Sequence, residues 1–95
     1  MRYINRWKDH KLKTIKVLRA AVLRENSRQL EKWGIQWREG FEWLAYLTEE
    51  VGELAEAITE NRYRAGTREA IRKEAIQVAT LALKIAEMNA KDYNP

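Results

Sequence analysis

The sequence predicts an all-α protein with three main helices, and three observations lead to that prediction. Apolar residues recur at three- and four-residue steps along most of the 95 residues, which is typical of amphipathic helices. Proline occurs only at the last position, and four glycines leave few places where a helix would have to end. No alternating apolar–polar run is long enough for a strand. The length suits one small domain, so we expect a single helical domain over residues 1–95.

The first helix is expected from about Asp9 to Lys32, preceded by an irregular or short helical arm over residues 1–10. After it, Gly34 is the expected C-cap glycine, and Gly40 closes a short loop. The apolar residues of this helix at helical spacing are Leu12, Ile15, Leu18, Val22 and Leu30.

The second helix is expected from about Phe41 to Asn61. The segment NRYRAG then turns the chain, and Thr67 is the expected N-cap of a third helix from Arg68 to about Ala90. The apolar stripe of the second helix consists of Phe41, Leu44, Leu47, Val51, Leu54 and Ile58.

Composition excludes several classes of protein. The chain has no cysteine and one histidine, His10, which argues against disulfide scaffolds, thiol catalysis and zinc sites. No apolar run approaches the roughly 18 to 20 residues of a membrane span, and the segment MRYINRWKDHKLK lacks the apolar region of a signal peptide. We therefore expect a cytoplasmic protein whose chemistry depends on carboxylates, basic residues and aromatic rings.

The charges are unevenly distributed. Residues 1–38 hold eleven Lys or Arg against three acids, a net charge of +8, whereas residues 39–61 hold seven glutamates and no basic residue. The basic segment favours a nucleic-acid or phosphate ligand, but the acidic block needs an explanation of its own.

Self-association is also expected. Three helices of about 20 residues span about 30 Å each, and a lone chain of this length buries a marginal core. We expect a homodimer or tetramer in which helices of two subunits complete a four-helix-like bundle.

Two features of the carboxylates point to a metal site. Glu50 and Glu53 are three residues apart, so two like charges lie on one side of the second helix. On a helical wheel, Glu74 lies in the middle of the apolar stripe of the third helix, with Gln77 at its edge. A buried carboxylate is costly unless it is paired or ligates a cation. A solvated acidic face would explain the first feature, and a salt bridge from Glu74 to an arginine of the first helix would explain the second. One divalent cation shared by Glu50, Glu53 and Glu74 would explain both.

Oxygen ligands without histidine or thiolate favour Mg²⁺, with Mn²⁺ as a substitute. Magnesium keeps positions open for water and phosphate, so such a site favours a phosphate ester or a nucleotide as its ligand. The candidate phosphate-binding residues are Lys84, Arg28 and Lys32, each of which would otherwise be a solvated surface charge. The candidate base- or sugar-binding residues are Trp33, Gln36 and Trp37, whose alternative role is to close the end of the bundle or form a subunit contact.

The segments LTEEVGELAEAI and KEAIQVATLALKI resemble the MazG-like branch of the all-α nucleotide pyrophosphohydrolases. In that family EExxE is followed, after a variable insertion, by ExxD on a neighbouring helix. Here EExxE spans Glu49 to Glu53, and the second motif begins at Glu74. The lead-in RQLEKWGIQ and EWLAYL resembles short phage- and mobile-element-type members, and the resemblance covers about residues 24–90.

The resemblance implies a Mg²⁺-dependent hydrolase that converts a nucleoside triphosphate, with a deoxynucleoside triphosphate favoured, to the monophosphate and pyrophosphate in a house-cleaning role. It places the metal carboxylates on Glu50, Glu53 and Glu74, and puts Glu49 where it would orient or deprotonate the attacking water. The family aspartate of ExxD corresponds to Gln77, which offers a neutral oxygen in place of a charged one. Gln77 is therefore a candidate ligand of lower charge.

Two other functions remain open from the sequence. The basic N-terminal segment would suit a nucleic-acid-binding helical module, although the acidic block would repel a phosphate backbone. The exchange of aspartate for Gln77 would suit a catalytically weakened MazG-like interaction protein. We expect a nucleotide ligand rather than a nucleic acid or a membrane.

Overall fold

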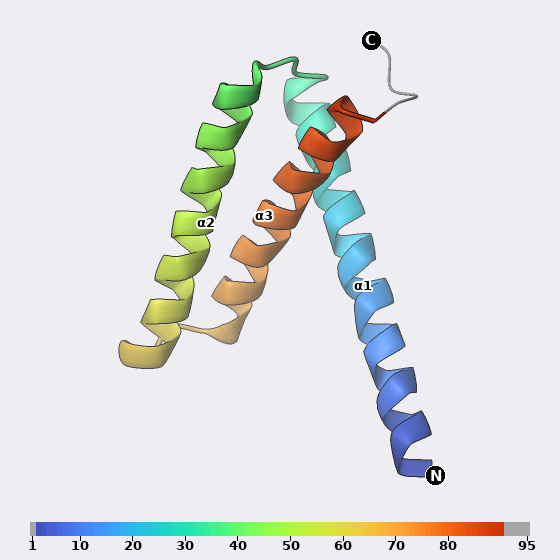
Figure 1. The fold of residues 1–95 in the computed structure, drawn as a ribbon. Helices are drawn as coiled ribbons and strands as arrows, with labels where there is room; N and C mark the ends of the chain where they lie inside the picture. Colours follow the sequence, from blue (N-terminus) through green and yellow to red (C-terminus); the bar gives the residue numbers. More distant parts are fainter. Residues whose placement is uncertain (1, 91–95) are drawn as a thin grey trace.

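The structure, a computed structural model, describes residues 2–90, with side chains from residue 11 onward. It has three helices, α1 (Arg2–Trp33), α2 (Gly40–Tyr63) and α3 (Arg68–Met88), and no strand within residues 2–90 (Figure 1). The expected all-α class and the number of helices are confirmed. No helix in the described part of the chain is long and apolar enough to cross a membrane.

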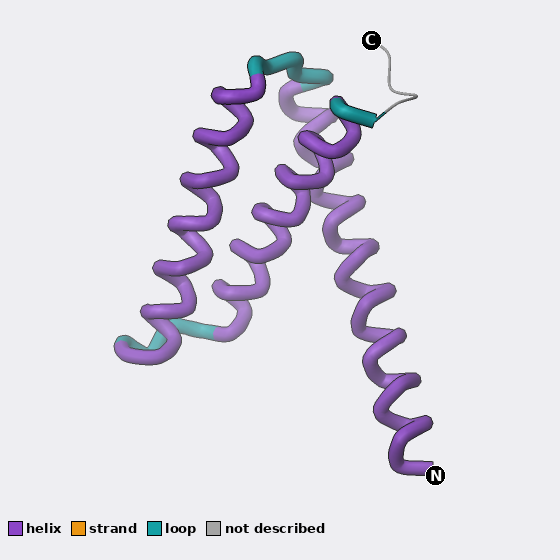
Figure 2. The backbone as a smooth tube through the Cα atoms, viewed as in Figure 1, coloured by secondary structure: helices purple, strands orange, loops and turns teal. Residues whose placement is uncertain are grey.

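The helix α3 lies between the other two and packs against both of them (Figure 2). Within residues 2–90, α1 and α2 do not pack on one another. The C-terminal half of α1 lies against α3, whereas its N-terminal half extends away from the α2–α3 hairpin (Figure 1). The end of α1, the start of α2 and the end of α3 therefore meet at one end of the molecule.

The helix ends follow local sequence signals. Gly34 has a φ of +70° and donates its backbone N–H to the Leu30 carbonyl at 2.8 Å, which is a glycine C-cap as expected. The hydroxyl of Thr67 accepts a hydrogen bond from the Ala70 backbone N–H at 3.1 Å, which confirms the expected N-cap of α3. At Gly66, a Cβ atom would lie 2.8 Å from Glu60 Cβ, so the α2–α3 turn needs a glycine there.

One boundary differs from the expectation. The first helix begins at Arg2 and not near Asp9. No glycine or proline interrupts residues 2–8, so nothing in the local backbone prevents the helix from extending through them.

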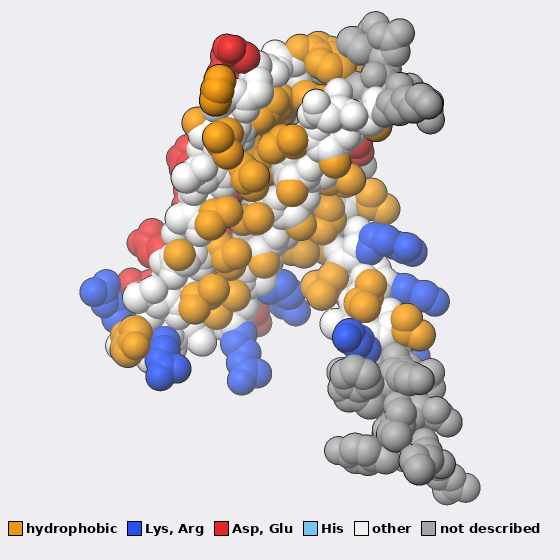
Figure 3. Space-filling view, viewed as in Figure 1, with side chains coloured by type: hydrophobic (Ala, Val, Ile, Leu, Met, Phe, Trp, Pro, Cys, Tyr) orange, Lys and Arg blue, Asp and Glu red, His pale blue; other side chains and the backbone are white. Residues whose placement is uncertain are grey.

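The core of the single chain is small. Among side chains 11–90, only Trp43 and Thr80 are buried, with exposed fractions of 6% and 0%. Figure 3 shows apolar side chains spread over the face of α2 and α3 that is turned toward the viewer. Most of the apolar stripe expected on the second helix is exposed, as at Phe41, Leu44 and Val51.

Candidate metal centre and the adjoining cleft

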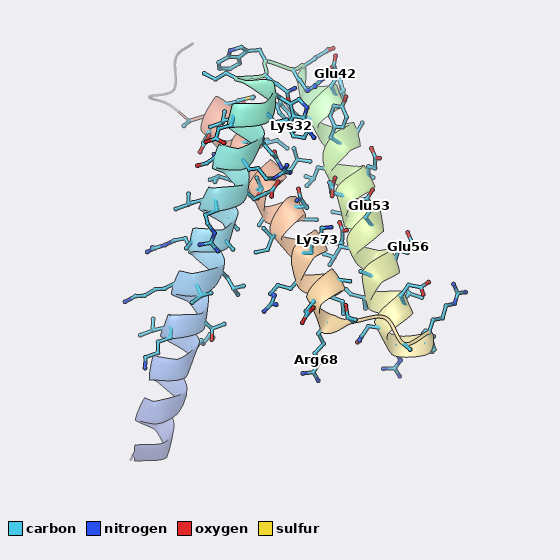
Figure 4. The ribbon with its side chains drawn as sticks, turned by 180° about the vertical axis from the view of Figure 1, so that it is seen from behind. Lys32, Glu42, Glu53, Glu56, Arg68 and Lys73 are labelled. Carbon is cyan, nitrogen blue, oxygen red and sulfur yellow. The ribbon has the colours of Figure 1, made fainter. Side chains whose placement is uncertain are left out.

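The structure brings together the three carboxylates that were expected to share a metal ion. Glu50 and Glu53 lie one turn apart on α2, and Glu74 faces them from α3. One carboxylate oxygen from each residue lies within 4.8 Å of the other two. Glu50 and Glu74 are half-buried and Glu53 is exposed, so the cluster is open to solvent on one side. Figure 4 shows Glu53 on α2 in a view from behind.

The surroundings of Glu50 in this cluster raise its pKa. Burial raises the pKa of its carboxyl, and repulsion from Glu53, Glu74 and Glu49 raises the pKa further. Its Oε2 atom is buried and has no hydrogen-bond partner. A buried carboxylate oxygen without a donor is costly in an unliganded site.

The salt bridge considered for Glu74 is not present. None of the ion pairs seen among side chains 11–90 includes Glu74, Glu50 or Glu53. Those pairs join Glu25, Glu42 and Glu60 to arginines three or four residues away in the sequence. The cluster holds three carboxylates, and Glu50 Oε2 has no hydrogen-bond partner. No basic side chain of the described chain pairs with the cluster. The donor set therefore suits a hard divalent cation, because these ions prefer oxygen ligands.

A cleft of about 300 Å³ adjoins this cluster, and Glu50 belongs to both. The cleft contains four of the six residues expected to bind substrate: Arg28, Trp33, Gln36 and Lys84. Its full lining is Arg28, Gln29, Trp33, Gln36, Arg38, Trp43, Tyr46, Glu50, Gln77, Leu81 and Lys84.

The other two expected substrate residues lie outside this cleft. Lys32 is exposed, and its ammonium lies 4.8 Å from the centre of the Trp33 ring. Trp37 is half exposed. Glu49, the expected catalytic residue, is exposed on α2 next to Glu50 and is not one of the three clustered carboxylates.

Gln77 is part of a polar network that joins α1 to α3. Its side-chain oxygen accepts a hydrogen bond from Gln29 Nε2 at 3.2 Å, and the same nitrogen donates to Glu25 Oε2 at 2.8 Å. The Lys84 ammonium donates to the Gln29 side-chain oxygen. Burial lowers the pKa of Lys84. Gln77 thus lines the same cleft as Glu50, with one lone pair of its amide oxygen already engaged.

Arg28 and Glu25 complete the network. Arg28 Nε donates to Glu25 Oε1 at 3.0 Å, and Arg28 Nη2 donates to Glu25 Oε2 at 2.7 Å. Mainly because of the Arg28 hydrogen bonds, the pKa of Glu25 falls to about 2. The carboxylate of Glu25 is therefore ionised and paired with the Arg28 guanidinium. The carboxylate of Glu50 has a buried oxygen without a hydrogen-bond partner.

Sequence reasoning missed several residues of the cleft and of the hydrogen-bond network beside it. Gln29 and Glu25 lie on the same side of α1 as Leu18 and Val22, so a polar residue within an apolar stripe was the available signal, as it was for Glu74. Arg38 stacks over Tyr46 at 4.8 Å and over Trp43 at 5.9 Å from the ring centres. Nothing in the spacing of a loop arginine indicated these ring contacts.

Comparison of the chain with protein-family models, with curated proteins and with solved structures finds no match.

Proposed function

We propose that this protein is a Mg²⁺-dependent nucleoside triphosphate pyrophosphohydrolase of the MazG-like type. One observation carries the proposal: Glu50 belongs both to a carboxylate cluster that suits a divalent cation and to a cleft lined by basic and aromatic side chains. A nucleotide combines the same elements, since its phosphates bind cations and basic groups, and its base stacks on aromatic rings.

In this proposal Glu50, Glu53 and Glu74 would hold the cation, which would neutralise the charge that builds on the phosphate oxygens. Lys84 and Arg28 would donate hydrogen bonds to the phosphates from the other side of the cleft. Trp33 and Gln36 would contact the base or sugar. Gln77, in place of an acid, would supply at most a neutral oxygen.

Glu49 would accept a proton from the attacking water as the water oxygen bonds to the α-phosphorus. The bond from the α-phosphorus to the oxygen that bridges to the β-phosphorus would break, and pyrophosphate would leave. Such a protein would act as a homodimer or tetramer that completes a four-helix-like bundle, and would serve to remove unwanted deoxynucleoside triphosphates in the cytoplasm.

The test is pyrophosphate release from a panel of ribo- and deoxynucleoside triphosphates, with and without Mg²⁺. We expect release that requires Mg²⁺ or Mn²⁺ and that is lost in Glu49→Gln. The control is Glu69→Gln, which changes an exposed glutamate of α3 outside the cluster. Absence of pyrophosphate release from every nucleotide would contradict the proposal.

A second candidate is a nucleic-acid-binding module, which one observation favours. Lys13, Lys16 and Arg19 are exposed on α1. Figure 3 shows basic side chains on the half of α1 that extends away from the hairpin. Binding to DNA that weakens steeply with salt, without turnover of any nucleotide, would favour this candidate.

A further inference from the structure

The cleft contains a third basic side chain, Arg38, to which the proposed reaction gives no role. Arg38 lies in the loop of residues 34–39, which joins α1 to α2 at the end of the molecule where the three helices meet (Figure 2). Its side chain is 28% exposed and lines the same cleft as Glu50 and Lys84. Arg38 therefore belongs to the site, although it lies on neither of the helices that supply the clustered carboxylates.

Two aromatic rings of α2 hold the Arg38 guanidinium in place. Its central carbon lies 4.8 Å from the centre of the Tyr46 ring and 5.9 Å from the centre of the Trp43 ring. The face of an aromatic ring attracts a cation, and Trp43 is itself buried, so the rings form a fixed support. These contacts position the guanidinium but supply no oxygen acceptor for its N–H groups.

The N–H groups of Arg38 have no close acceptor in the part of the chain that the structure describes. Within residues 11–90 the guanidinium donates no hydrogen bond, and its nearest carboxylate oxygen, Glu42 Oε2, lies 3.6 Å from Nη1. That separation is longer than a hydrogen bond. The Glu42 side chain is 55% exposed, so water competes for its carboxylate and the ion pair is weak.

The other two basic residues of the cleft are already engaged. Arg28 Nη2 donates to Glu25 Oε2 at 2.7 Å, and the Lys84 ammonium donates to the Gln29 side-chain oxygen. Among the three basic side chains that line this cleft, Arg38 is thus the one that combines a fixed position with uncommitted donors. An arginine in this state is suited to bind an anion that enters from solution.

One face of α2 connects Arg38 with the carboxylate cluster. Trp43, Tyr46, Glu50 and Glu53 follow one another at steps of three, four and three residues, so they lie within an arc of about 80° around the helix. Tyr46 and Glu50 are separated by about 6 Å along the helix axis. Because Arg38 contacts the two aromatic residues of this face, it lies beside the cluster, on the side toward the start of α2.

We propose that Arg38 is a phosphate-binding residue, whose guanidinium donates hydrogen bonds to a polyphosphate chain that also reaches the carboxylate cluster. A guanidinium presents two parallel N–H groups that match two oxygens of one phosphate, which an ammonium does not. The aromatic contacts order this fork before the anion arrives, and so reduce the entropy lost on binding. The inference rests on the proposed function for its choice of ligand, but it does not require hydrolysis.

The test uses inorganic tripolyphosphate in the presence of Mg²⁺ as the probe, and measures its binding to the full-length chain by calorimetric titration. We expect Arg38→Gln to weaken binding by about 10- to 100-fold, because hydrogen bonds between charged groups are strong. Arg38→Lys should recover only part of this loss, since it keeps the charge without the fork.

The matched control is Arg64→Gln. Arg64 also lies in a loop next to α2 and also pairs with a glutamate four residues away, Glu60, but it is not part of the cleft. This variant removes the same charge from the chain and should leave tripolyphosphate binding unchanged. An equal loss in Arg64→Gln and Arg38→Gln would show a general effect of net charge and would overturn the proposal.

Glu42→Gln separates a binding role of Arg38 from a structural one. We expect this variant to bind tripolyphosphate as tightly as the parent or more tightly, because it removes a competitor for the guanidinium. If Arg38 served only to form its ion pair, Arg38→Gln and Glu42→Gln would lower the melting temperature alike and neither would weaken binding. Circular dichroism on each variant checks the fold, and Arg38→Lys decides the question if Arg38→Gln does not fold.

The outcomes distinguish this inference from the proposed function. Pyrophosphate release by the parent, together with tripolyphosphate binding that Arg38→Gln does not weaken, would overturn the inference and leave the proposed function standing. Binding that depends on Arg38 without pyrophosphate release from any nucleotide would do the reverse. A parent that does not bind tripolyphosphate would also overturn the inference. So would a variant that loses binding of a nucleoside alone, since the guanidinium would then stack on a base.

Discussion

Glu50 lines the cleft and Glu25 contacts two cleft residues, Arg28 and Gln29, and their surroundings shift the pKa values of these two carboxyls in opposite directions. Glu25 is contacted by Arg28 and Gln29, and its pKa falls to about 2. Glu50 is surrounded by Glu53, Glu74 and Glu49, and its pKa rises. Both side chains are half-buried, so burial alone does not decide the direction.

The difference indicates what each region requires. The network of Glu25 is complete within one chain, since its carboxylate has cationic and amide donors. The cluster of Glu50 is incomplete, since it holds three carboxylates, an orphaned oxygen and no donor from the described chain. A region of the first kind fixes structure, and a region of the second kind has a donor set that could hold a cation from solution.

The largest expected effect is at Glu74. Glu74→Gln removes one of three charged ligands, so Mg²⁺-dependent turnover should fall by more than about 100-fold, because even outer-shell partners of metal ligands contribute 10- to 100-fold. The helical fold should persist, since the change also relieves repulsion around Glu50. Turnover and circular dichroism measured on the same preparation test both parts. A large loss of thermal stability with unchanged metal binding would show that Glu74 has a structural role.

Gln77 lies between the two regions and can sharpen the comparison. Gln77→Asp adds a negative charge beside the cluster, so Mg²⁺ should bind about 3- to 10-fold more tightly, and the gain in melting temperature on adding Mg²⁺ should exceed that of the parent. Calorimetric titration of both proteins measures the change, with Ala79→Asp on the exposed side of α3 as the control. Equal affinities would place Gln77 outside the metal's coordination shell.

Glu25→Gln should break the complete network. The change deprives Arg28 of its carboxylate partner, and the free energy of unfolding should fall by about 1 kcal/mol, a small value because Arg28 is 53% exposed. Glu60→Gln, which removes the exposed pair with Arg64, should cost less. Urea denaturation of the three proteins measures these differences. A larger loss in Glu60→Gln would contradict the ranking.

The pH dependence of stability without metal should separate the two carboxylates. The lowered pKa of Glu25 contributes stability that is present above about pH 4.5 and is lost as the pH falls toward 2. The raised pKa of Glu50 acts in the opposite sense: the folded state is favoured below pH 4.5, and this contribution is lost as the pH rises through the folded pKa. Thermal melts across pH should show the acid-side loss reduced in Glu25→Gln and the loss at higher pH reduced in Glu50→Gln. Identical profiles for both variants would refute this assignment.

Much of this structure could be predicted because it depends on local signals. Helical periodicity, Gly34 and Thr67 placed the helices, and the position of Glu74 within an apolar stripe predicted its approach to Glu50 and Glu53. The extension of α1 to Arg2 was missed because the absence of a helix breaker is a weak signal. Gln29 and Arg38 were missed because their partners lie on other elements or on aromatic rings whose orientation no periodicity reveals. The exposure of Leu44 and Val51 could not be predicted, since an apolar stripe in the sequence does not show whether another helix of the same chain packs against it.

The arrangement of α1 beside the α2–α3 hairpin also affects how the chain folds. The α2–α3 hairpin joins neighbouring segments through the short turn at Gly66, so its closure involves a small loop and should be fast. The contact between α1 and α3 joins residues about 50 positions apart, such as Gln29 and Gln77, and offers few buried side chains in return. Refolding should therefore begin with a rapid phase whose rate is independent of protein concentration. A slower phase should follow as the C-terminal half of α1 docks on α3.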